Sequence, residues 1–152
     1  MNGKTYYIFY AEDDIDDQDL FIEAAHLVSE SLQVIIAKNG EELITLLNSP
    51  PPVPNAIFLD LNLPIKNGFQ ILKEIRQSDL LKNLPVVIFS TSDDANSINS
   101  AKQFGANLYI IKPSSFNSLK NAIRYSISLK WETLGASDEN FIYDPTNNLS
   151  DD

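Results

Sequence analysis

Five polar side chains that could carry chemistry each follow a short apolar run of the sequence. They are Glu12, Asp13, Asp60, Ser90 and Lys112. Carboxylates crowded into one place repel one another unless a hard cation neutralises them, and an all-oxygen site with room for water suits Mg²⁺. If the fold brings these residues together, the sequence therefore predicts a metal site with a hydroxyl and an ammonium group beside it.

Some polar residues near the ends of the apolar runs, taken singly, have plain structural explanations. Asp14 or Asp16 could cap a helix, and Lys112 could be a solvated surface charge. Asp60 is harder to explain, because the apolar run 56–59 has no structural reason to end in an acid that faces two more acids and a lysine. We therefore interpret the set as functional.

The strands and helices predicted around these residues alternate along the chain. Five continuous apolar runs predict strands that are buried on both faces. The predicted strands are Tyr6–Ala11, Leu32–Ala37, Ala56–Leu59, Val86–Phe89 and Asn107–Ile111. Apolar spacings of three and four predict helices between and after them, the last over Ser115–Leu134. This alternation predicts an α/β fold, a doubly wound parallel sheet with helices on both faces and its ligand site beyond the carboxyl ends of the strands.

The composition fits one domain and excludes several classes of function. The 152 residues include no cysteine, which excludes disulfides, thiolate metal sites and thiol nucleophiles. A net charge of −10 disfavours contact with nucleic acid or an anionic membrane. No apolar run approaches the roughly 20 residues that span a bilayer, and no cleavable leader is visible, so we expect a cytoplasmic protein.

The chain resembles the receiver domains of two-component response regulators, the CheY-like family, over about residues 4–134. The features that carry the resemblance are the pair Glu12-Asp13, the run 58–64 around Asp60, Gly68, Ser90, Tyr109 and the pair Lys112-Pro113. The intervals of 30 residues from Asp60 to Ser90 and of 22 from Ser90 to Lys112 also fit that family.

The resemblance implies a five-stranded (βα)5 sheet of the flavodoxin/CheY-like type, with the strand order 2-1-3-4-5. It implies that Asp60 is the nucleophile that accepts a phosphoryl group from a histidine kinase, as a 4-aspartylphosphate, while Lys112 and Ser90 contact the phosphoryl oxygens. It also implies Mg²⁺, or Mn²⁺, as cofactor. The implied metal ligands are Asp13, Asp60, the backbone carbonyl of Asn62 and, through water, Glu12.

Four residues are expected to serve the switch and its geometry. The resemblance implies that Ser90 moves toward the phosphoryl group and that Tyr109 then swings inward, whereas a static, half-buried Tyr109 is the alternative. Gly68 is expected either to supply a positive φ or simply to begin a helix. Pro113 is expected to follow a cis peptide bond, which would aim the preceding lysine into the site.

Residues 135–152 are predicted to form an acidic tail rather than an output domain, which leaves residues 1–134 as the receiver domain. The tail holds five acidic residues, no basic ones and an apolar island, 141–143. This island, with Trp131 and Leu134, could dock on a second copy or a partner, or fold back over the domain. We favour a homodimer through the last helix and the tail.

The resemblance implies a sensor or hybrid histidine kinase, or a phosphotransfer protein, as partner, together with an unidentified target. Features such as the hydroxyl run 90–92 and the C-terminal extension resemble phytochrome-associated regulators. A Mg²⁺-dependent phosphatase with an aspartate nucleophile is a rival interpretation, but it normally needs a second carboxylate where Asn62 stands, so a turnover enzyme is not expected. A flavodoxin-like electron carrier and a pseudo-receiver scaffold that is not phosphorylated are weaker rivals, because the loop after the first strand is acidic and the set of site residues is complete.

Overall fold

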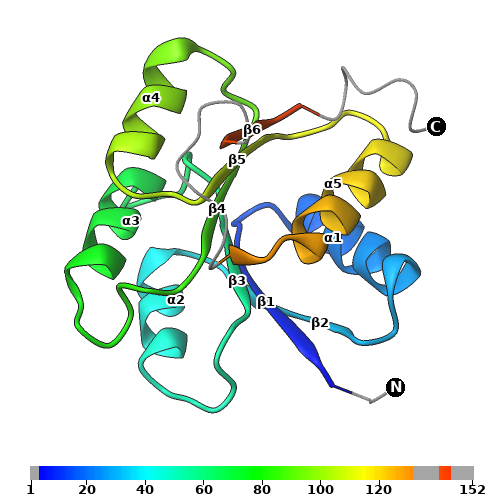
Figure 1. Ribbon diagram of the computed structural model, residues 1–152, viewed down its shortest axis with the longest axis horizontal. Coiled ribbons are helices and arrows are strands. Elements are labelled where there is room, and N and C mark those ends of the chain that lie inside the picture. The colour runs from blue at the N-terminus through cyan, green and yellow to red at the C-terminus, as the bar shows by residue number, and fades with distance from the viewer. Residues whose placement is uncertain (1–3, 132–140, 145–152) are drawn as a thin grey trace.

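One parallel sheet forms the centre of the molecule. The computed structural model of the protein describes residues 4–131 and 141–144. Its strands are β1 (Tyr6–Ala11), β2 (Leu32–Ala37), β3 (Ala56–Leu59), β4 (Val86–Ser90), β5 (Leu108–Ile111) and β6 (Ile142–Tyr143). They lie in the order β2-β1-β3-β4-β5-β6, and every neighbouring pair is parallel (Figure 1). The predicted parallel α/β fold is confirmed, whereas the predicted number of five strands is wrong.

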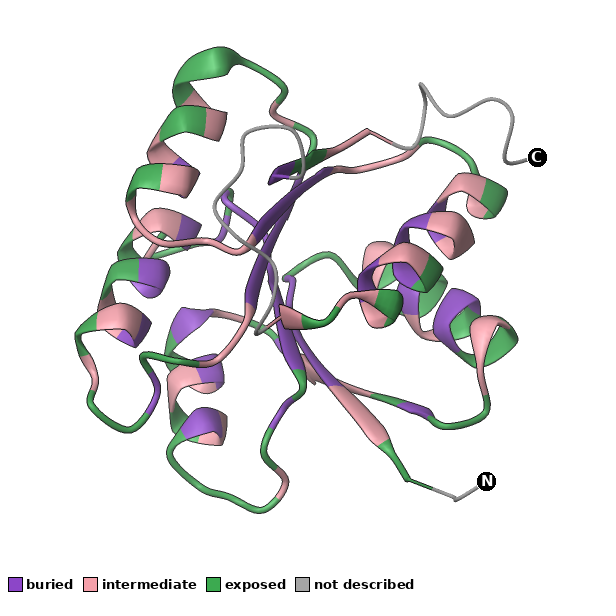
Figure 2. Cartoon of the chain, in the orientation of Figure 1, coloured by how far each residue is buried: buried purple, intermediate pink, exposed green. Residues whose placement is uncertain are grey.

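The strands fill two separate cores, because successive side chains of a strand point to opposite faces of the sheet. In β1, Phe9 and Ala11 enter one core, while Ile8 and Tyr10 enter the other. The strands β3 and β4 are buried along their whole length (Figure 2). This burial on both faces explains why the strands appear in the sequence as continuous apolar runs.

Five helices cover the two faces in the described part of the chain. They are α1 (Ile15–Val28), α2 (Gly40–Leu47), α3 (Gly68–Gln77), α4 (Ala95–Gln103) and α5 (Phe116–Ser128). The helices α1 and α5 pack together on one face, and α2, α3 and α4 lie on the other (Figure 1). Each begins after an Asp, Asn or Ser whose side chain accepts a hydrogen bond from the first turn. None of these described helices is long and apolar enough to cross a bilayer.

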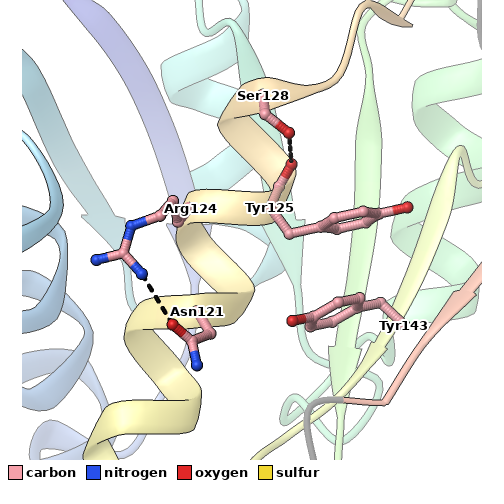
Figure 3. Close-up of a pocket in the computed structure, with 5 residues that line it drawn as sticks. All are labelled: Asn121, Arg124, Tyr125, Ser128 and Tyr143. Carbon is pink, nitrogen blue, oxygen red and sulfur yellow. Dashed lines mark hydrogen bonds between the residues drawn. The ribbon is translucent and has the colours of Figure 1, made fainter. Parts of the chain in front are cut away.

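The apolar island of the tail forms the sixth strand. β6 pairs with β5, and the neighbouring Phe141 is buried in the core that α2, α3 and α4 cover. The ring of Tyr143 stacks on Tyr125 of α5, with ring centroids 4.4 Å apart, beside a surface hollow of about 370 Å³ (Figure 3). Of the alternatives for this island, the structure therefore shows the one in which it folds back over its own domain. The island folds back because Phe141 packs against core residues that are distant in the sequence.

The last helix is shorter than predicted. α5 ends at Ser128 rather than at residue 134, because Leu129 leaves the helical region with φ −78° and ψ 144°. Serine hydroxyls in the last turn donate to backbone carbonyls there, which competes with continuation of the helix. Trp131 does not overhang the domain but packs against its core, with the indole nitrogen 3.4 Å from the hydroxyl of Tyr6. Leu134 lies outside the described residues.

Candidate functional site

The candidate site lies at the carboxyl ends of the strands. β1 and β3 are paired up to their last residues, so Glu12 and Asp60 follow as neighbours. β4 and β5 are paired in the same way up to Ser90 and Ile111, so Lys112, the residue after β5, lies next to Ser90. Residues from four distant parts of the sequence meet here because parallel strands end at the same edge of a sheet.

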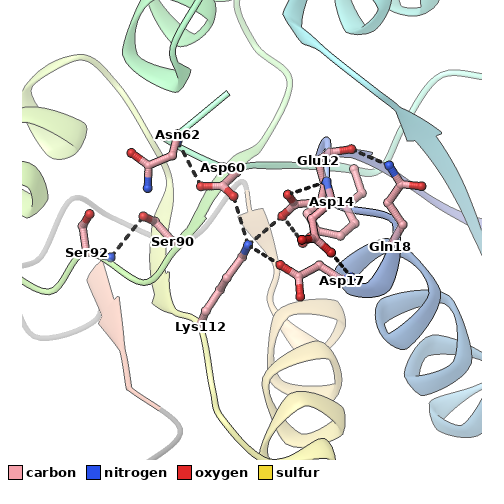
Figure 4. Close-up of polar contacts among 10 residues, drawn as sticks. Glu12, Asp14, Asp17, Gln18, Asp60, Asn62, Ser90, Ser92 and Lys112 are labelled. Carbon is pink, nitrogen blue, oxygen red and sulfur yellow. Dashed lines mark hydrogen bonds and ion pairs between the residues drawn. The ribbon is translucent and has the colours of Figure 1, made fainter. Parts of the chain in front are cut away.

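Lys112 is the centre of the cluster (Figure 4). Its Nζ lies 2.6 Å from Oε1 of Glu12 and 3.0 Å from Oδ2 of Asp60. A third carboxylate, that of Asp17 in α1, has its Oδ2 3.2 Å from the same Nζ. An ammonium group has three N–H donors, so these three contacts use all of them. Three carboxylates around one ammonium leave two negative charges unbalanced.

Burial and charge oppose each other within this cluster. Burial alone would lower the pKa of Lys112, but the hydrogen bond to Glu12 and the charge of Asp60 outweigh it and raise that pKa. Burial raises the pKa of Glu12, and the lysine offsets this only in part. The buried Tyr10 hydroxyl donates to Glu12 Oε1 at 3.0 Å, and the backbone N–H of Asp14 donates to Oε2 at 3.2 Å. Both oxygens of Glu12 are therefore engaged, and its orientation is fixed.

The carboxylate of Asp60 presents two oxygens with different partners. Oδ2 accepts from Lys112, and Oδ1 accepts from the backbone N–H of Asn62 at 3.1 Å. Gly68, the first residue of α3, packs against this segment: a Cβ there would lie 2.6 Å from the carbonyl oxygen of Asp60 and 2.8 Å from Cα of Leu61. The expectation of a positive φ at Gly68 is wrong, since the residue simply begins a helix. Glycine is required here by the close approach of two backbone segments.

The donor set around Asp60 fits a hard divalent cation. Asp13 is exposed, and no hydrogen bond or ion pair joins its side chain to another described residue. The other carboxylates turn toward Lys112, and among residues 4–131 and 141–144 no three acidic, histidine or cysteine side chains form a ready metal centre. The carboxylates of Asp13 and Asp60 and the carbonyl of Asn62 are nevertheless the hard oxygen donors that Mg²⁺ and Mn²⁺ prefer.

Ser90 and Tyr109, the two residues expected to form the switch, both contact Ser92. Ser90 is fully buried, and its Oγ accepts from the N–H of Ser92 at 3.2 Å. Tyr109 is fully buried rather than half-buried, and its hydroxyl donates to the carbonyl of Ser92 at 2.7 Å. Burial raises the pKa of Tyr109 to about 12, with the charges of nearby acids adding to the effect, so its hydroxyl keeps its proton at neutral pH.

The peptide bond before Pro113 differs from the expectation. The cis peptide bonds of the described residues lie within the run 50–52, so the bond between Lys112 and Pro113 is trans, and the expectation of a cis bond is wrong. A cis bond is not needed to aim the lysine, because the end of β5 already places its ammonium group in the cluster.

Two residues of the site were missed in the sequence. Asp17 lies four residues after Asp13, one turn into α1, and this helical spacing beside the acidic pair is the signal that could have revealed it. Tyr10 carries no such signal, because it belongs to a strand and its ring packs among the aromatic rings of the core. The interpretation of Asp14 as a helix cap is confirmed, since it is the N-cap of α1.

The fold and the site together define a class of protein: a receiver-type α/β domain with acids after β1 and β3 and a lysine after β5. The family profile described as the response regulator receiver domain matches residues 8–124. The chain belongs to this family and is a phosphorelay signalling domain of the two-component type.

The chain is similar to regulators that serve phytochromes. Response regulator Rcp1 of Synechocystis sp. (strain PCC 6803) is 30% identical over 132 residues, which cover 84% of this chain and 90% of Rcp1. The phosphorylated cyanobacterial phytochrome response regulator RcpA has 30% identity and a TM-score of 0.74 over 86% of this chain and 96% of its own. The Mn²⁺-bound form of Rcp1 has 31% identity and a TM-score of 0.72 over 86% and 97%. The predicted likeness to phytochrome-associated regulators is confirmed.

Proposed function

We propose that Asp60 accepts a phosphoryl group from the phosphohistidine of a partner kinase or phosphotransfer protein, and that the chain passes the signal on through protein contacts. The observation that carries this proposal is the environment of the Asp60 carboxylate. It is 8% exposed at the end of β3, with the ammonium of Lys112 at 3.0 Å from one oxygen and a backbone N–H at 3.1 Å from the other. These contacts orient a nucleophile and place a cation where the phosphoryl anion would arrive.

The transfer would exchange one bond to phosphorus for another. An oxygen of Asp60 forms a bond to the phosphorus while the bond from the phosphorus to the histidine nitrogen breaks, and the electron pair of that bond stays on the nitrogen. Lys112 offsets the charge of the phosphoryl oxygens, and the hydroxyl of Ser90 donates to one of them. Later attack by water on the phosphorus releases inorganic phosphate and restores the carboxylate.

A divalent cation fits this chemistry, and we propose Mg²⁺. Asp13, Asp60 and the backbone carbonyl of Asn62 would hold it directly, and Glu12 would hold it through water. When bound, the cation neutralises the acidic cluster so that an anionic phosphoryl donor can approach. The oxygen donor set and the existence of a Mn²⁺-bound form of the related Rcp1 support this assignment.

We further propose that Ser90 and Tyr109 report the phosphorylation. Movement of Ser90 toward a phosphoryl oxygen would break its hydrogen bond to Ser92, whose carbonyl accepts from Tyr109. Tyr109 also lies opposite Ile142 in the register of β5 and β6, so a change at Ser92 would reach the sixth strand. An NMR comparison with and without a phosphoryl analogue tests this route, and an unmoved Tyr109 would contradict it.

The protein would be a phosphoryl acceptor of the cytoplasm rather than a turnover enzyme. The position two residues after the nucleophile holds Asn62 and not a second acid, so assays with small phosphoesters should be negative. A homodimer through α5 and the tail stays a prediction, although Phe141 is already buried within its own chain. Sedimentation equilibrium that shows a monomer in both phosphorylation states would remove it.

Intact-mass analysis after incubation with a small acyl phosphate and Mg²⁺ tests the proposed function. We expect wild type and Asp79→Asn, in which an exposed acid is replaced, to gain one phosphoryl group. Asp60→Asn, and wild type in excess chelator, should gain none. A phosphoryl group that remains on Asp60→Asn would refute the assignment of the acceptor.

A further inference from the structure

Asp17 contacts the phosphorylation site but has no part in the chemistry proposed above. It lies in the first turn of α1, where its backbone N–H donates to the N-cap residue Asp14 at 3.0 Å. This bond fixes the backbone from which its carboxylate reaches Lys112, with Oδ2 at 3.2 Å from Nζ (Figure 4). The Asp17–Lys112 ion pair thus joins α1 to the end of β5, two elements that the sheet register does not connect.

Lys112 has no donor to spare for a phosphoryl group. Its three N–H groups already serve Glu12, Asp17 and Asp60. Phosphorylation adds close to two negative charges and three strongly accepting oxygens at Asp60. When the ammonium moves outward to meet those oxygens, at least one of the present contacts must lengthen or break.

Solvation decides which contact is lost first. The side chain of Glu12 is 2% exposed, so losing the lysine would leave its carboxylate buried without a cation. The side chain of Asp17 is 45% exposed, and water can replace the lysine there at little cost. The contact to Asp17 is also the longest of the three.

We propose that Asp17 is a positioning residue that holds Lys112 toward α1 while Asp60 is unphosphorylated and releases it when the phosphoryl group arrives. The inference rests on the proposed function of Asp60. Because Asp17 competes with the phosphoryl group for Lys112, it lowers the stability of the phosphorylated state. Its release also changes the contacts of the first turn of α1, so that α1 becomes a second element that senses phosphorylation.

Equilibrium titration with beryllofluoride, a phosphoryl analogue, at saturating Mg²⁺ tests the competition. The comparison is between Asp17→Asn and Asp16→Asn, since Asp16 is exposed in the same turn and none of the described contacts involves its side chain. Both variants remove one negative charge from α1, but only the first removes the ion pair. We expect Asp17→Asn to bind the analogue about two- to fivefold more tightly than Asp16→Asn, the range that follows from measured exposed ion pairs. Asp17→Glu, which keeps the carboxylate, should stay close to wild type.

The sign of the effect separates positioning from mere structural damage, because damage to α1 would weaken binding. In ¹⁵N spectra, the analogue should shift the amide signals of residues 14–18 in wild type, and these shifts should be much smaller in Asp17→Asn. Equal affinities of the two variants, or weaker binding by Asp17→Asn, would overturn the inference. If wild type itself does not bind the analogue, or if Asp60→Asn binds it equally well, the proposed function fails as well, so the two failures are distinguishable.

Discussion

Gly68 should be intolerant of even one added methyl group, because two backbone segments meet there. In Gly68→Ala, the Cβ would lie 2.6 Å from the carbonyl oxygen of Asp60 and 2.8 Å from Cα of Leu61, whereas real Cβ contacts are essentially never under 3.0 Å. The start of α3 and the end of β3 must therefore separate by at least about 0.4 Å. Overpacking of this kind costs about 1–3 kcal/mol, and the better helix propensity of alanine recovers only part of it.

The unfolding free energy in urea and the rate of phosphorylation together test this prediction. We expect Gly68→Ala to lose about 1–2 kcal/mol of unfolding free energy and to accept the phosphoryl group more slowly, since the displaced backbone carries Asp60. Gly40→Ala is the matched control: its Cβ would clash with the buried side chain of Ile71 rather than with the backbone of Asp60. We expect it to lose stability as well but to keep the wild-type phosphorylation rate. Unchanged stability and an unchanged phosphorylation rate in Gly68→Ala would refute the reasoning.

Three further predictions concern packing, buried hydrogen bonds and pH. Phe141→Ala should lower the unfolding free energy by about 3 kcal/mol, because it empties a buried site in the core. Arg76→Met should cost about 1–3 kcal/mol in urea unfolding, because the guanidinium donates to four oxygens around the start of β4 and β5. Lys112 has a raised pKa in the folded state, so its stabilising effect is complete at neutral pH and is lost as pH rises above about 10.4. The decline in the unfolding free energy of Lys112→Met, measured from pH 8 upward, should be shallower than that of wild type. It should not vanish, because the buried Tyr10 and Tyr109 also have raised pKa values and contribute to the decline.

Matched variants separate these effects from general damage. Ile142→Ala, at a side chain that is 43% exposed, should cost less than about 1 kcal/mol, so an equal loss in both tail variants would contradict the packing argument. Arg124→Met removes an exposed guanidinium and should change stability little. Lys38→Met, at an exposed lysine, should keep the alkaline decline of wild type. If its decline is shallower as well, the assignment to Lys112 is wrong.

The main elements were predictable because their signals are local. Each of the first five strands is a continuous apolar run, and a strand buried on both faces needs nothing else to be recognised. β6 could not be found in this way: two residues do not make a pattern, and the strand exists because Phe141 enters a core built by distant helices. The end of α5 at Ser128 was missed for a related reason, since apolar spacing continues to Trp131 and Leu134 while the backbone turns away at Leu129.

The candidate site, too, was predictable from the sequence only in part. Asp60, Glu12 and Lys112 could be proposed to meet, because strand ends in a parallel sheet converge and the residue types are rare at such positions. The partners of Lys112 could not be ranked from the sequence. The ammonium reaches Glu12 across 100 residues of chain, and Asp17 becomes its third partner through the placement of α1.

Local patterns in the sequence were therefore enough to predict the class of fold, the family and the residue types at the edge of the sheet. Contacts formed on folding bury Phe141 in the core, bring Gly68 against the backbone of Asp60, and bring three carboxylates to one ammonium. The physical reason is that periodicity and residue type act within a few residues of chain. The distances between side chains that are far apart in the sequence, and their burial from solvent, are instead set by elements that meet only after folding.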